Sequence, residues 1–247
     1  MMGIGREFME KTRGSRLGPS PQQRGLPQPP LSVGLRQGRR MALPDPGSLE
    51  IGRIDLREAI DRRRSLRDYE DRPLSLDGLS LLLWCTQGVR EVIPGRATFR
   101  TVPSAGARHP FETVVFARSV EGLDAAFYQY AAVDHALIEW PLASSGAERL
   151  AAACYGQAMI EESGATFLWV ADAVRTTWRY GERGYRYIHL DAGHICQNLY
   201  LAAESIGAGA CAIAAFDDDA INELLGLEDP DRFVAYLATV GPRKDSG

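Results

Sequence analysis

Helical periodicity marks three stretches of the chain. Residues 55–64 are rich in helix-forming types and begin with Asp55, a residue type that caps helices. Residues 75–86 place apolar side chains three or four positions apart, after a serine that also suits a cap. The same spacing runs through residues 188–206 and stops at Gly207, as is typical of a helix end. The pattern predicts two opening helices and one long core helix.

Strand patterns lie between these helices and after the last one. Residues 112–118 and 126–130 are rich in β-branched and aromatic types, and Gly122 between them indicates a hairpin turn. Residues 165–171 are continuously apolar, which predicts a central strand covered on both faces. A final strand is predicted over residues 233–240. This order of elements favours an α+β domain with three layers, α/β/α, over a repeating βαβ fold.

The first 48 residues differ in composition from the rest. Residues 1–47 hold seven of the 14 prolines and eight basic against three acidic residues, with almost no apolar periodicity. We therefore predict that residues 1–48 form a disordered tail and that residues 49–247 form one folded domain. Beyond residue 47, 20 basic and 29 acidic residues remain, a net charge of about −9 that repels nucleic acid. We expect a small-molecule partner and no nucleic acid.

Several classes of protein and site are excluded. No apolar run approaches the roughly 20 residues of a membrane span, and no secretory signal follows the basic N-terminus, so we expect a cytoplasmic protein with no membrane partner. His189 and His194 are five positions apart, about 140° around a helix, and the four cysteines form no C-x-x-C pair, so no metal site is expected. The glycines from Gly207 follow a helix rather than a strand, which argues against a dinucleotide-binding turn.

The most informative segment is residues 62–67, where four arginines and a serine crowd the end of a predicted helix. Such a cluster can serve solubility alone. Arginine with serine is also the combination that holds a phosphate group through charge-assisted hydrogen bonds. These two interpretations are equally weighted by the segment itself.

The spacing R-x-S-x-R followed by an aromatic residue resembles the opening motif of the nitroreductase superfamily of FMN enzymes, and Arg63, Ser65 and Arg67 match it. The order of further blocks makes the resemblance specific and extends it over residues 50–241. These blocks resemble the SagB-type (ThcOx-like) dehydrogenases within that superfamily, and they comprise residues 79–88, 100–110, 120–123 and 190–199.

The resemblance implies a nitroreductase-like fold, with a central, mostly antiparallel sheet flanked by helices and FMN at the interface of a homodimer. The apolar faces of residues 79–84 and 195–203 are the expected seam of that dimer. In similar proteins a small-residue stretch lies against the flavin of the partner subunit, and here it consists of Pro103, Ser104, Ala105 and Gly106. The backbone N–H groups of Ala214 and Ala215 are expected near flavin N5 and O4.

The same resemblance assigns the charged ligands of FMN. Arg63 and Ser65 would hold the phosphate with help from Arg64, and Arg67 would lie near flavin N1, where a cation stabilises the reduced ring. Two C-terminal residues match further phosphate ligands by position only, with a solvated tail as an equal alternative: Arg243 and Lys244.

The candidate catalytic residues are Arg179 and Tyr180. Azoline-oxidising members of the SagB-type group carry a Lys-Tyr pair at the matching place. Arginine is a poor general base because its pKa lies above about 12, although it can orient a carboxylate or carbonyl. Tyr180 would then protonate a substrate anion. The alternative is that both residues only pack over the dimer seam.

Three functions remain open at this point. The first is an FMN-dependent oxidoreductase that passes hydride from NAD(P)H to a small nitroaromatic or quinone-like acceptor by a ping-pong mechanism. The second is a SagB-type dehydrogenase that oxidises azolines on a modified peptide, which the overall resemblance favours and Arg179 disfavours. The third is a flavin-binding protein without turnover.

Overall fold

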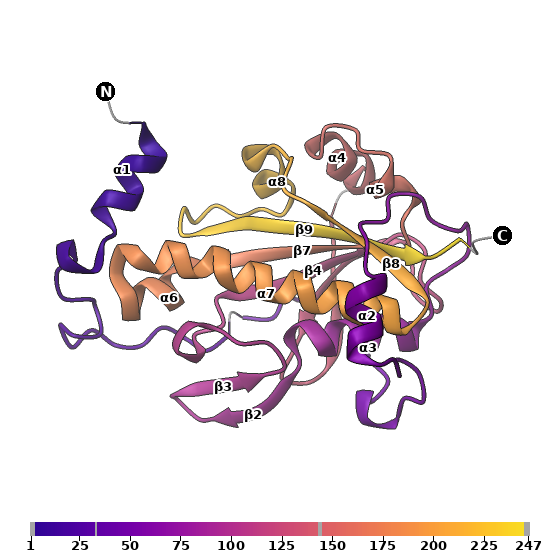
Figure 1. The fold of residues 1–247 in the computed structure, drawn as a ribbon, viewed down its shortest axis with the longest axis horizontal. Helices are drawn as coiled ribbons and strands as arrows, with labels where there is room; N and C mark the ends of the chain where they lie inside the picture. The colour runs from indigo at the N-terminus through magenta and orange to yellow at the C-terminus, as the bar shows by residue number, and fades with distance from the viewer. Residues whose placement is uncertain (1–2, 33, 143–144, 245–247) are drawn as a thin grey trace.

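The computed structural model describes residues 3–32, 34–142 and 145–244, and its centre is a seven-stranded antiparallel sheet (Figure 1). The strand order is β1-β6-β5-β4-β7-β9-β8. The strands are β1 (Arg40–Ala42), β4 (Phe111–Ala117), β5 (Ala126–Ala131), β6 (Ala136–Trp140), β7 (Ala165–Asp172), β8 (Ala208–Ile213) and β9 (Arg232–Pro242). A separate hairpin consists of β2 (Val89–Ile93) and β3 (Ala97–Arg100).

Strand β7 lies in the interior of this sheet. It pairs with β4 on one side, from Phe111↔Ala171 to Ala117↔Ala165, and with β9 on the other. Both faces of β7 are covered, because three consecutive residues of this strand are fully buried: Phe167, Leu168 and Trp169. The predictions of a central buried strand, of the hairpin β4–β5 and of a final strand are all confirmed.

Helices cover both faces of the sheet and give the expected three layers. On one face, side chains of α3 (Leu76–Gln87) and α7 (Gly184–Ser205) share a core with alternate residues of β4 and β7, and α2 (Leu56–Arg62) packs on α7. On the other face the second core holds side chains of α4 (Gly146–Ala153), α5 (Met159–Glu162) and α8 (Asp218–Leu224). The remaining helices are α1 (Ile4–Lys11) and α6 (Ala173–Tyr180), with short 3-10 turns at Gly14–Arg16, Pro46–Ser48, Ala105–Ala107 and Gly181–Arg183.

The predicted helix boundaries follow local chemistry. The Asp55 side chain accepts hydrogen bonds from the first amides of α2, and the Ser75 hydroxyl accepts one at the start of α3. Helix α7 begins four residues before the predicted start and ends as expected, with Gly207 in the left-handed region at φ 67°.

The described residues among the first 48 are ordered, contrary to the prediction of a disordered tail. Strand β1 pairs with β6 and closes one edge of the sheet, so the folded domain begins before residue 49. Further upstream, the Trp178 indole N–H donates to the Leu26 carbonyl at 2.9 Å, and Arg186 Nε donates to Thr12 Oγ1 at 2.7 Å. Tertiary contacts with α6 and α7 supply the partners that this segment's own composition lacks.

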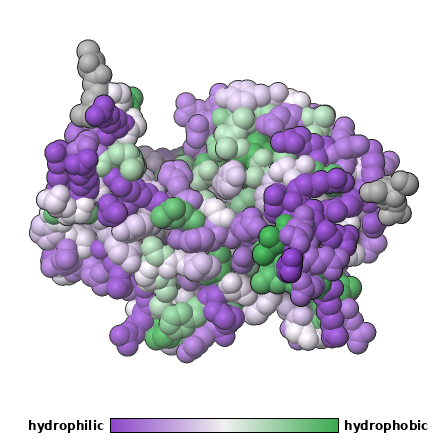
Figure 2. Space-filling model, in the orientation of Figure 1, coloured by the Kyte–Doolittle hydropathy of each residue, from purple (hydrophilic) through white to green (hydrophobic). Residues whose placement is uncertain are grey.

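The expected dimer seam is also wrong. Leu79 and Leu83 on α3 and Ile195 and Leu199 on α7 are buried in the core of their own chain, because α3 and α7 pack on each other. Figure 2 shows a mostly hydrophilic face with separate hydrophobic patches on the side that carries α7. Several large apolar side chains are exposed on α2, α7 and the β2–β3 hairpin, namely Leu56, Ile60, Leu190, Val92 and Phe99.

None of the helices in the described part of the chain is both long and apolar enough to span a bilayer.

Candidate functional site

The arginine-rich segment runs from the end of α2 onto the edge of the sheet. Arg63 is the C-cap of α2, and Ser65 lies beside Ala210 of β8 in an isolated parallel bridge. The amide of Leu66 donates to the Ala210 carbonyl at 2.9 Å. The segment is therefore fixed along β8 by backbone contacts, and its polar side chains are positioned by the strand.

A buried tyrosine holds the serine of this segment. The Ser65 and Tyr200 hydroxyl oxygens are 2.9 Å apart, and the amide of Ala212 in β8 donates to the Tyr200 hydroxyl at 2.8 Å. Because that hydroxyl already accepts from an amide, its own hydrogen is available for Ser65 Oγ. Either hydroxyl could donate in this pair, and with Tyr200 as the donor the Ser65 hydroxyl keeps its hydrogen for a ligand. The Arg63 guanidinium lies 5.2 Å from the centre of the Tyr200 ring.

Three cations of the segment have no counter-ion in the described chain. Arg62 pairs with Glu58 at 2.6 Å, whereas Arg63, Arg64 and Arg67 form no ion pair with any described residue. Burial raises the pKa of the Cys211 thiol in β8, and Arg67 and Ser65 oppose that shift, which places both next to the strand. Unpaired guanidinium groups beside a hydroxyl donor fit a phosphate group. The described residues contain no cluster of metal-ligating side chains.

Ala214 and Ala215 follow directly after β8 and are exposed. Four residues of extended chain separate Ala210, beside Ser65, from Ala214, a distance of about 13 Å. Gln157, which follows α4, donates from Nε2 to the Ala215 carbonyl and to the Cys154 carbonyl, both at 2.9 Å. One strand thus carries the arginine segment near its middle and the Ala214–Ala215 turn at its end, and Gln157 fixes that turn.

The stretch from Pro103 to Gly106 is held by α7. The Ser104 hydroxyl donates to Asp191 Oδ2 at 2.6 Å, and the Ala105 amide donates to Asp191 Oδ1 at 3.3 Å. Burial raises the pKa of the Asp191 carboxyl, and these two hydrogen bonds oppose the shift. Pro103 and Gly106 are exposed, so the stretch presents its surface outward from the chain.

Gly106 brings the candidate catalytic pair to this stretch. Its φ is 58°, and a Cβ at this position would lie 2.5 Å from the Tyr180 hydroxyl oxygen and 2.9 Å from Arg179 Nε. Only glycine fits both the backbone angle and the contact. The Tyr180 ring meets the ring of Tyr187 edge to face at 4.8 Å, and Arg179 is exposed without an ion pair among the described residues. Arg179 and Tyr180 are therefore neighbours of the small-residue stretch.

The candidate residues form two groups within one chain rather than a single site. Both groups depend on α7, one through Tyr200 and the other through Asp191. Nine helical residues separate these two positions, which corresponds to about 13 Å along the axis and about 180° around it. The group of Arg63, Ser65 and Ala214 thus lies on the opposite side of α7 from the group of Ser104 and Tyr180.

The two C-terminal basic residues are already paired within the chain. Arg243 contacts the buried carboxylate of Glu204, and Lys244 contacts Asp68, the neighbour of Arg67. Lys244 is therefore close to the arginine segment, and Arg243 is bound to the end of α7. Neither contributes an uncompensated charge to the candidate site.

Three residues of this arrangement were not found from the sequence: Tyr200, Gln157 and Asp191. Tyr200 and Asp191 lie on the predicted core helix, and a polar group on such a face is the signal that points to them. Gln157 lies in a segment without periodicity, so no sequence signal identifies it.

The sequence was compared with protein families and with known proteins, and both comparisons found similar proteins. A model of the nitroreductase family matches residues 60–241. The chain is 37% identical over 180 residues, 73% of its length and 88% of the relative's, to MJ1384 of Methanocaldococcus jannaschii, which is described as a nitroreductase. It is 31% identical over 163 residues to the trifolitoxin-processing protein TfxB of Rhizobium leguminosarum bv. trifolii, which covers 63% of this chain and 44% of TfxB.

Solved structures show the same fold. A nitroreductase from Anabaena variabilis superposes with a TM-score of 0.64 at 31% identity, over 77% of this chain and 38% of that chain. A chain of the E. coli microcin synthetase McbBCD complex with truncated pro-MccB17 bound superposes with a TM-score of 0.63 at 21% identity, over 98% of this chain and 92% of that one. The chain thus spans less than half the length of TfxB and of the Anabaena protein.

Proposed function

The chain belongs to the nitroreductase family of oxidoreductases, and from this premise we propose that it binds FMN and passes hydride from NAD(P)H to a small nitroaromatic or quinone-like acceptor in a ping-pong cycle. FMN would supply the N5 atom that accepts hydride from one substrate and returns it to the next. The observation that carries the proposal is the set of three arginines, Arg63, Arg64 and Arg67, that flank Ser65 in sequence beside β8 and form no ion pair with a described residue.

The phosphate of FMN is assigned to the α2 end of β8. Arg63 and Ser65 would bind it through charge-assisted hydrogen bonds, and Arg64 would add to the positive potential. With Tyr200 as the donor of their shared hydrogen bond, the Ser65 hydroxyl has a hydrogen free for this role. The phosphate would supply the negative charge that no described residue provides to these arginines.

The ring of FMN is assigned to the other end of β8. Ala214 and Ala215 would offer backbone N–H groups to it, and Gln157 keeps that turn in place. Arg67 would place its charge near the side of the ring that becomes anionic on reduction. Arg243 and Lys244 are left with supporting roles, because both hold carboxylates of this chain.

A homodimer would join the two groups of candidate residues. The stretch from Pro103 to Gly106 lies on the opposite side of α7 from Ser65, so it cannot close over a flavin held by the same chain. A second copy would present its own stretch, together with its Arg179 and Tyr180. The exposed apolar side chains on α2, α7 and the β2–β3 hairpin are the candidate contact surface.

The first experiment is the absorption spectrum of the purified protein with and without NADPH under anaerobic conditions. We expect the two visible flavin bands, their loss on addition of NADPH and their return on addition of a quinone. A flavin spectrum that NADPH and NADH leave unchanged would favour the flavin-binding protein without turnover. A colourless protein that does not take up added FMN would contradict the proposal.

A second candidate function is the oxidation of azolines on a modified peptide. It is favoured by the likeness to TfxB, a toxin-processing protein, and by the shared fold with the microcin synthetase chain. The presence of Arg179 beside Tyr180 disfavours it, since arginine cannot accept a proton near neutral pH. A substrate peptide would have to reach the exposed Arg179 at the surface.

Tyr180→Phe and Arg179→Lys separate the two functions. If Tyr180 protonates a small acceptor, Tyr180→Phe slows flavin reoxidation by about 10²- to 10⁴-fold and leaves reduction by NAD(P)H unchanged, as stopped-flow absorbance will show. For azoline oxidation, Arg179→Lys is expected to raise the rate, because a lysine that a partner copy or the bound peptide covers can be tuned toward a neutral pKa, and arginine cannot. If neither substitution alters either half-reaction, Arg179 and Tyr180 have only a packing role, and neither proposed catalytic role holds.

A further inference from the structure

A cavity of about 230 Å³ lies apart from the candidate flavin residues, at one end of the β4–β5 pair. The register of the two strands runs from Ala117↔Ala126 to Val114↔Gln129 and then stops, although β4 begins at Phe111 and β5 continues to Ala131. The strands separate over these ends, and the cavity occupies the space between them. It shares no lining residue with either group of the candidate site.

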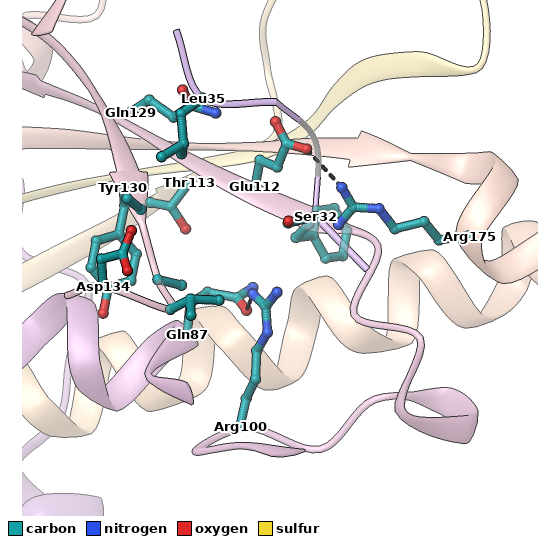
Figure 3. Close-up of a pocket in the computed structure, with 14 residues that line it drawn as sticks. Ser32, Leu35, Gln87, Arg100, Glu112, Thr113, Gln129, Tyr130, Asp134 and Arg175 are labelled. Carbon is teal, nitrogen blue, oxygen red and sulfur yellow. Dashed lines mark hydrogen bonds and ion pairs between the residues drawn. The ribbon is translucent and has the colours of Figure 1, made fainter. Parts of the chain in front are cut away.

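Arg100, at the end of β3, points into this cavity beside Gln87, as Figure 3 shows. Its side chain donates from Nη1 to Gln87 Oε1 at 2.7 Å and from Nε to Thr98 Oγ1 at 3.4 Å, and Nη2 makes no hydrogen bond with a described residue. Arg100 is only 7% exposed and has no carboxylate within 4 Å in the described chain. Burial lowers the pKa of Arg100 to about 10, so the guanidinium still carries its charge at neutral pH.

The carboxylates that line the cavity are already matched by other cations. Glu112 pairs with Arg175 at 2.9 Å, drawn in Figure 3, and with Arg232 at 3.2 Å. Asp134 pairs with Arg40 at 3.2 Å. The charge of Arg100 is therefore the one left over in the cavity. Burying a charge without a partner costs free energy. An anion that binds beside the charge reduces this cost.

A second polar group in the cavity also lacks a partner. Thr113 Oγ1, on the unpaired end of β4, is buried and makes no hydrogen bond within the described residues. A buried hydroxyl without a partner costs free energy, and such groups are rare in proteins. Arg100 and Thr113 together provide donors with no acceptor among the described residues. The rest of the lining is mixed, with apolar side chains of Leu35, Phe111 and Ala131 beside polar ones.

We propose that this cavity binds a small monocarboxylic acid with an apolar body. The carboxylate would accept hydrogen bonds from Arg100 and Thr113, and the apolar part would contact Phe111 and Leu35. A single uncompensated charge matches a monoanion better than a phosphate dianion. The size of the cavity and the apolar part of its lining suit an aromatic or short branched acid rather than a free inorganic anion.

Calorimetric titration of the full chain with benzoate tests the proposal, with benzamide and inorganic phosphate as the neutral and inorganic probes. We expect benzoate to bind and benzamide and phosphate to bind at least tenfold more weakly. The same titration on the flavin-free Arg63→Ala/Ser65→Ala variant excludes binding at the candidate flavin site, and the benzoate affinity should be unchanged there. Equal affinity for benzamide, or stronger binding of phosphate, would overturn the carboxylate assignment.

Two variants locate the binding. Arg100→Gln removes a charge-assisted contact and should weaken benzoate binding by roughly 10- to 150-fold. Thr113→Val keeps the side-chain volume, removes only the unpartnered hydroxyl, and should weaken it by roughly two- to tenfold. Arg96→Gln, an exposed arginine on the same hairpin, is the matched control and should change nothing. Unchanged benzoate affinity in folded Thr113→Val and Arg100→Gln would refute the site, and loss in Arg96→Gln would show that the effect is only one of surface charge.

Discussion

At the scale of single residues, the candidate phosphate site depends on a hydroxyl pair rather than on arginine alone. The Tyr200 hydroxyl accepts from the β8 backbone and shares a hydrogen bond with Ser65, and with Tyr200 as its donor the Ser65 hydroxyl is free to donate. The same ring lies under the Arg63 guanidinium. The tyrosine therefore positions both groups that would touch the phosphate, although it has no such contact of its own.

Replacing Arg63 and Ser65 together by alanine should remove most of the affinity for FMN. Each change deletes a charge-assisted contact worth roughly 1.5 to 3 kcal/mol. Flavin fluorescence titration measures the loss, with circular dichroism to show that the fold is kept. Arg62→Ala is the matched control, since Arg62 already pairs with Glu58. Flavin that stays with the double variant through gel filtration would count against the site.

His109 gives the chain a specific dependence of stability on pH. It is 4% exposed, and burial together with Arg100 and Arg108 lowers the pKa of its imidazole to about 3. The unfolded chain protonates this histidine below about pH 6.5, whereas the folded chain does not. Stability is therefore fully present above pH 6.5 and falls as the pH decreases, by up to about 1.4 kcal/mol per pH unit.

Urea unfolding at pH 7 and pH 5.5 measures this contribution. His109→Asn cannot titrate, and asparagine tolerates the left-handed backbone at this position, where φ is 44°. The variant should lose less stability than the natural chain between the two pH values. Identical slopes for the two proteins would show that His109 is protonated in the folded state.

The sequence identifies residues whose role is carried by spacing and misses those whose role depends on tertiary neighbours. Arg63, Ser65 and Arg67 could be proposed from the sequence because their spacing and chemistry are local. Tyr200 lies 135 positions away from Ser65, and no local pattern connects them. No local pattern shows the ion pairs of Arg243 and Lys244 either. Their position near the C-terminus therefore suggested phosphate ligands, although both side chains are already paired with carboxylates of the chain.

At the scale of elements, the stretch from Ser104 to Gly106 is a rigid turn clamped between α7 and the end of α6. Asp191 holds it from one side, and Arg179 and Tyr180 press against Gly106 from the other. The amides and the backbone angle of this turn are thus fixed before any ligand binds. In the proposed dimer, the exposed surface of this turn would therefore be preorganised for the partner.

Gly106→Ala should disrupt this turn more than its backbone angle alone explains. Gly122→Ala is the matched control, because Gly122 also has a positive φ, 74°, but no atom within 4 Å of a Cβ. Both variants should lose about 1 to 2 kcal/mol of unfolding free energy from the left-handed backbone. Gly106→Ala should lose more and should also slow acceptor reduction, since the methyl group displaces Tyr180. Equal losses and equal rates would show that Tyr180 is not held by this contact.

Elements with their own periodicity were predicted correctly, whereas the N-terminal region and several further elements, among them β6, β8, the β2–β3 hairpin, α4, α5, α6 and α8, were not predicted. Helices α2, α3 and α7 and strands β4, β5, β7 and β9 follow from apolar spacing and caps. Residues 3–32 and β1 take their order from distant partners such as Trp178 and β6. The composition of a segment indicates how much apolar surface that segment can bury by itself. It does not show whether the segment can pack on a surface formed elsewhere in the chain.

At the scale of the whole molecule, α7 separates the two groups of candidate residues, which in the proposed function a second copy would join. Figure 1 shows this helix crossing one face of the sheet, with α2 near one end and α6 near the other. Asp191 and Tyr200 lie on opposite sides of the helix, so the group around Ser104 and the group around Ser65 face apart. In a twofold dimer each half-site would meet the other half from the partner.

The last prediction is that the protein is a homodimer whose dissociation releases the flavin. A stable dimer of this kind should bury more than about 2,000 Å² of largely apolar surface. Leu190, on α7 one residue before Asp191, is 59% exposed, and Leu190→Glu should weaken the dimer by about 100-fold or more, because each copy loses an apolar contact of roughly 1.5 to 3 kcal/mol. Ile4→Glu, at an 86% exposed position on α1, is the control and should leave the dimer intact. Light scattering with simultaneous flavin absorbance gives mass and cofactor content together, and an FMN-loaded monomer at micromolar concentration would contradict a site shared between copies.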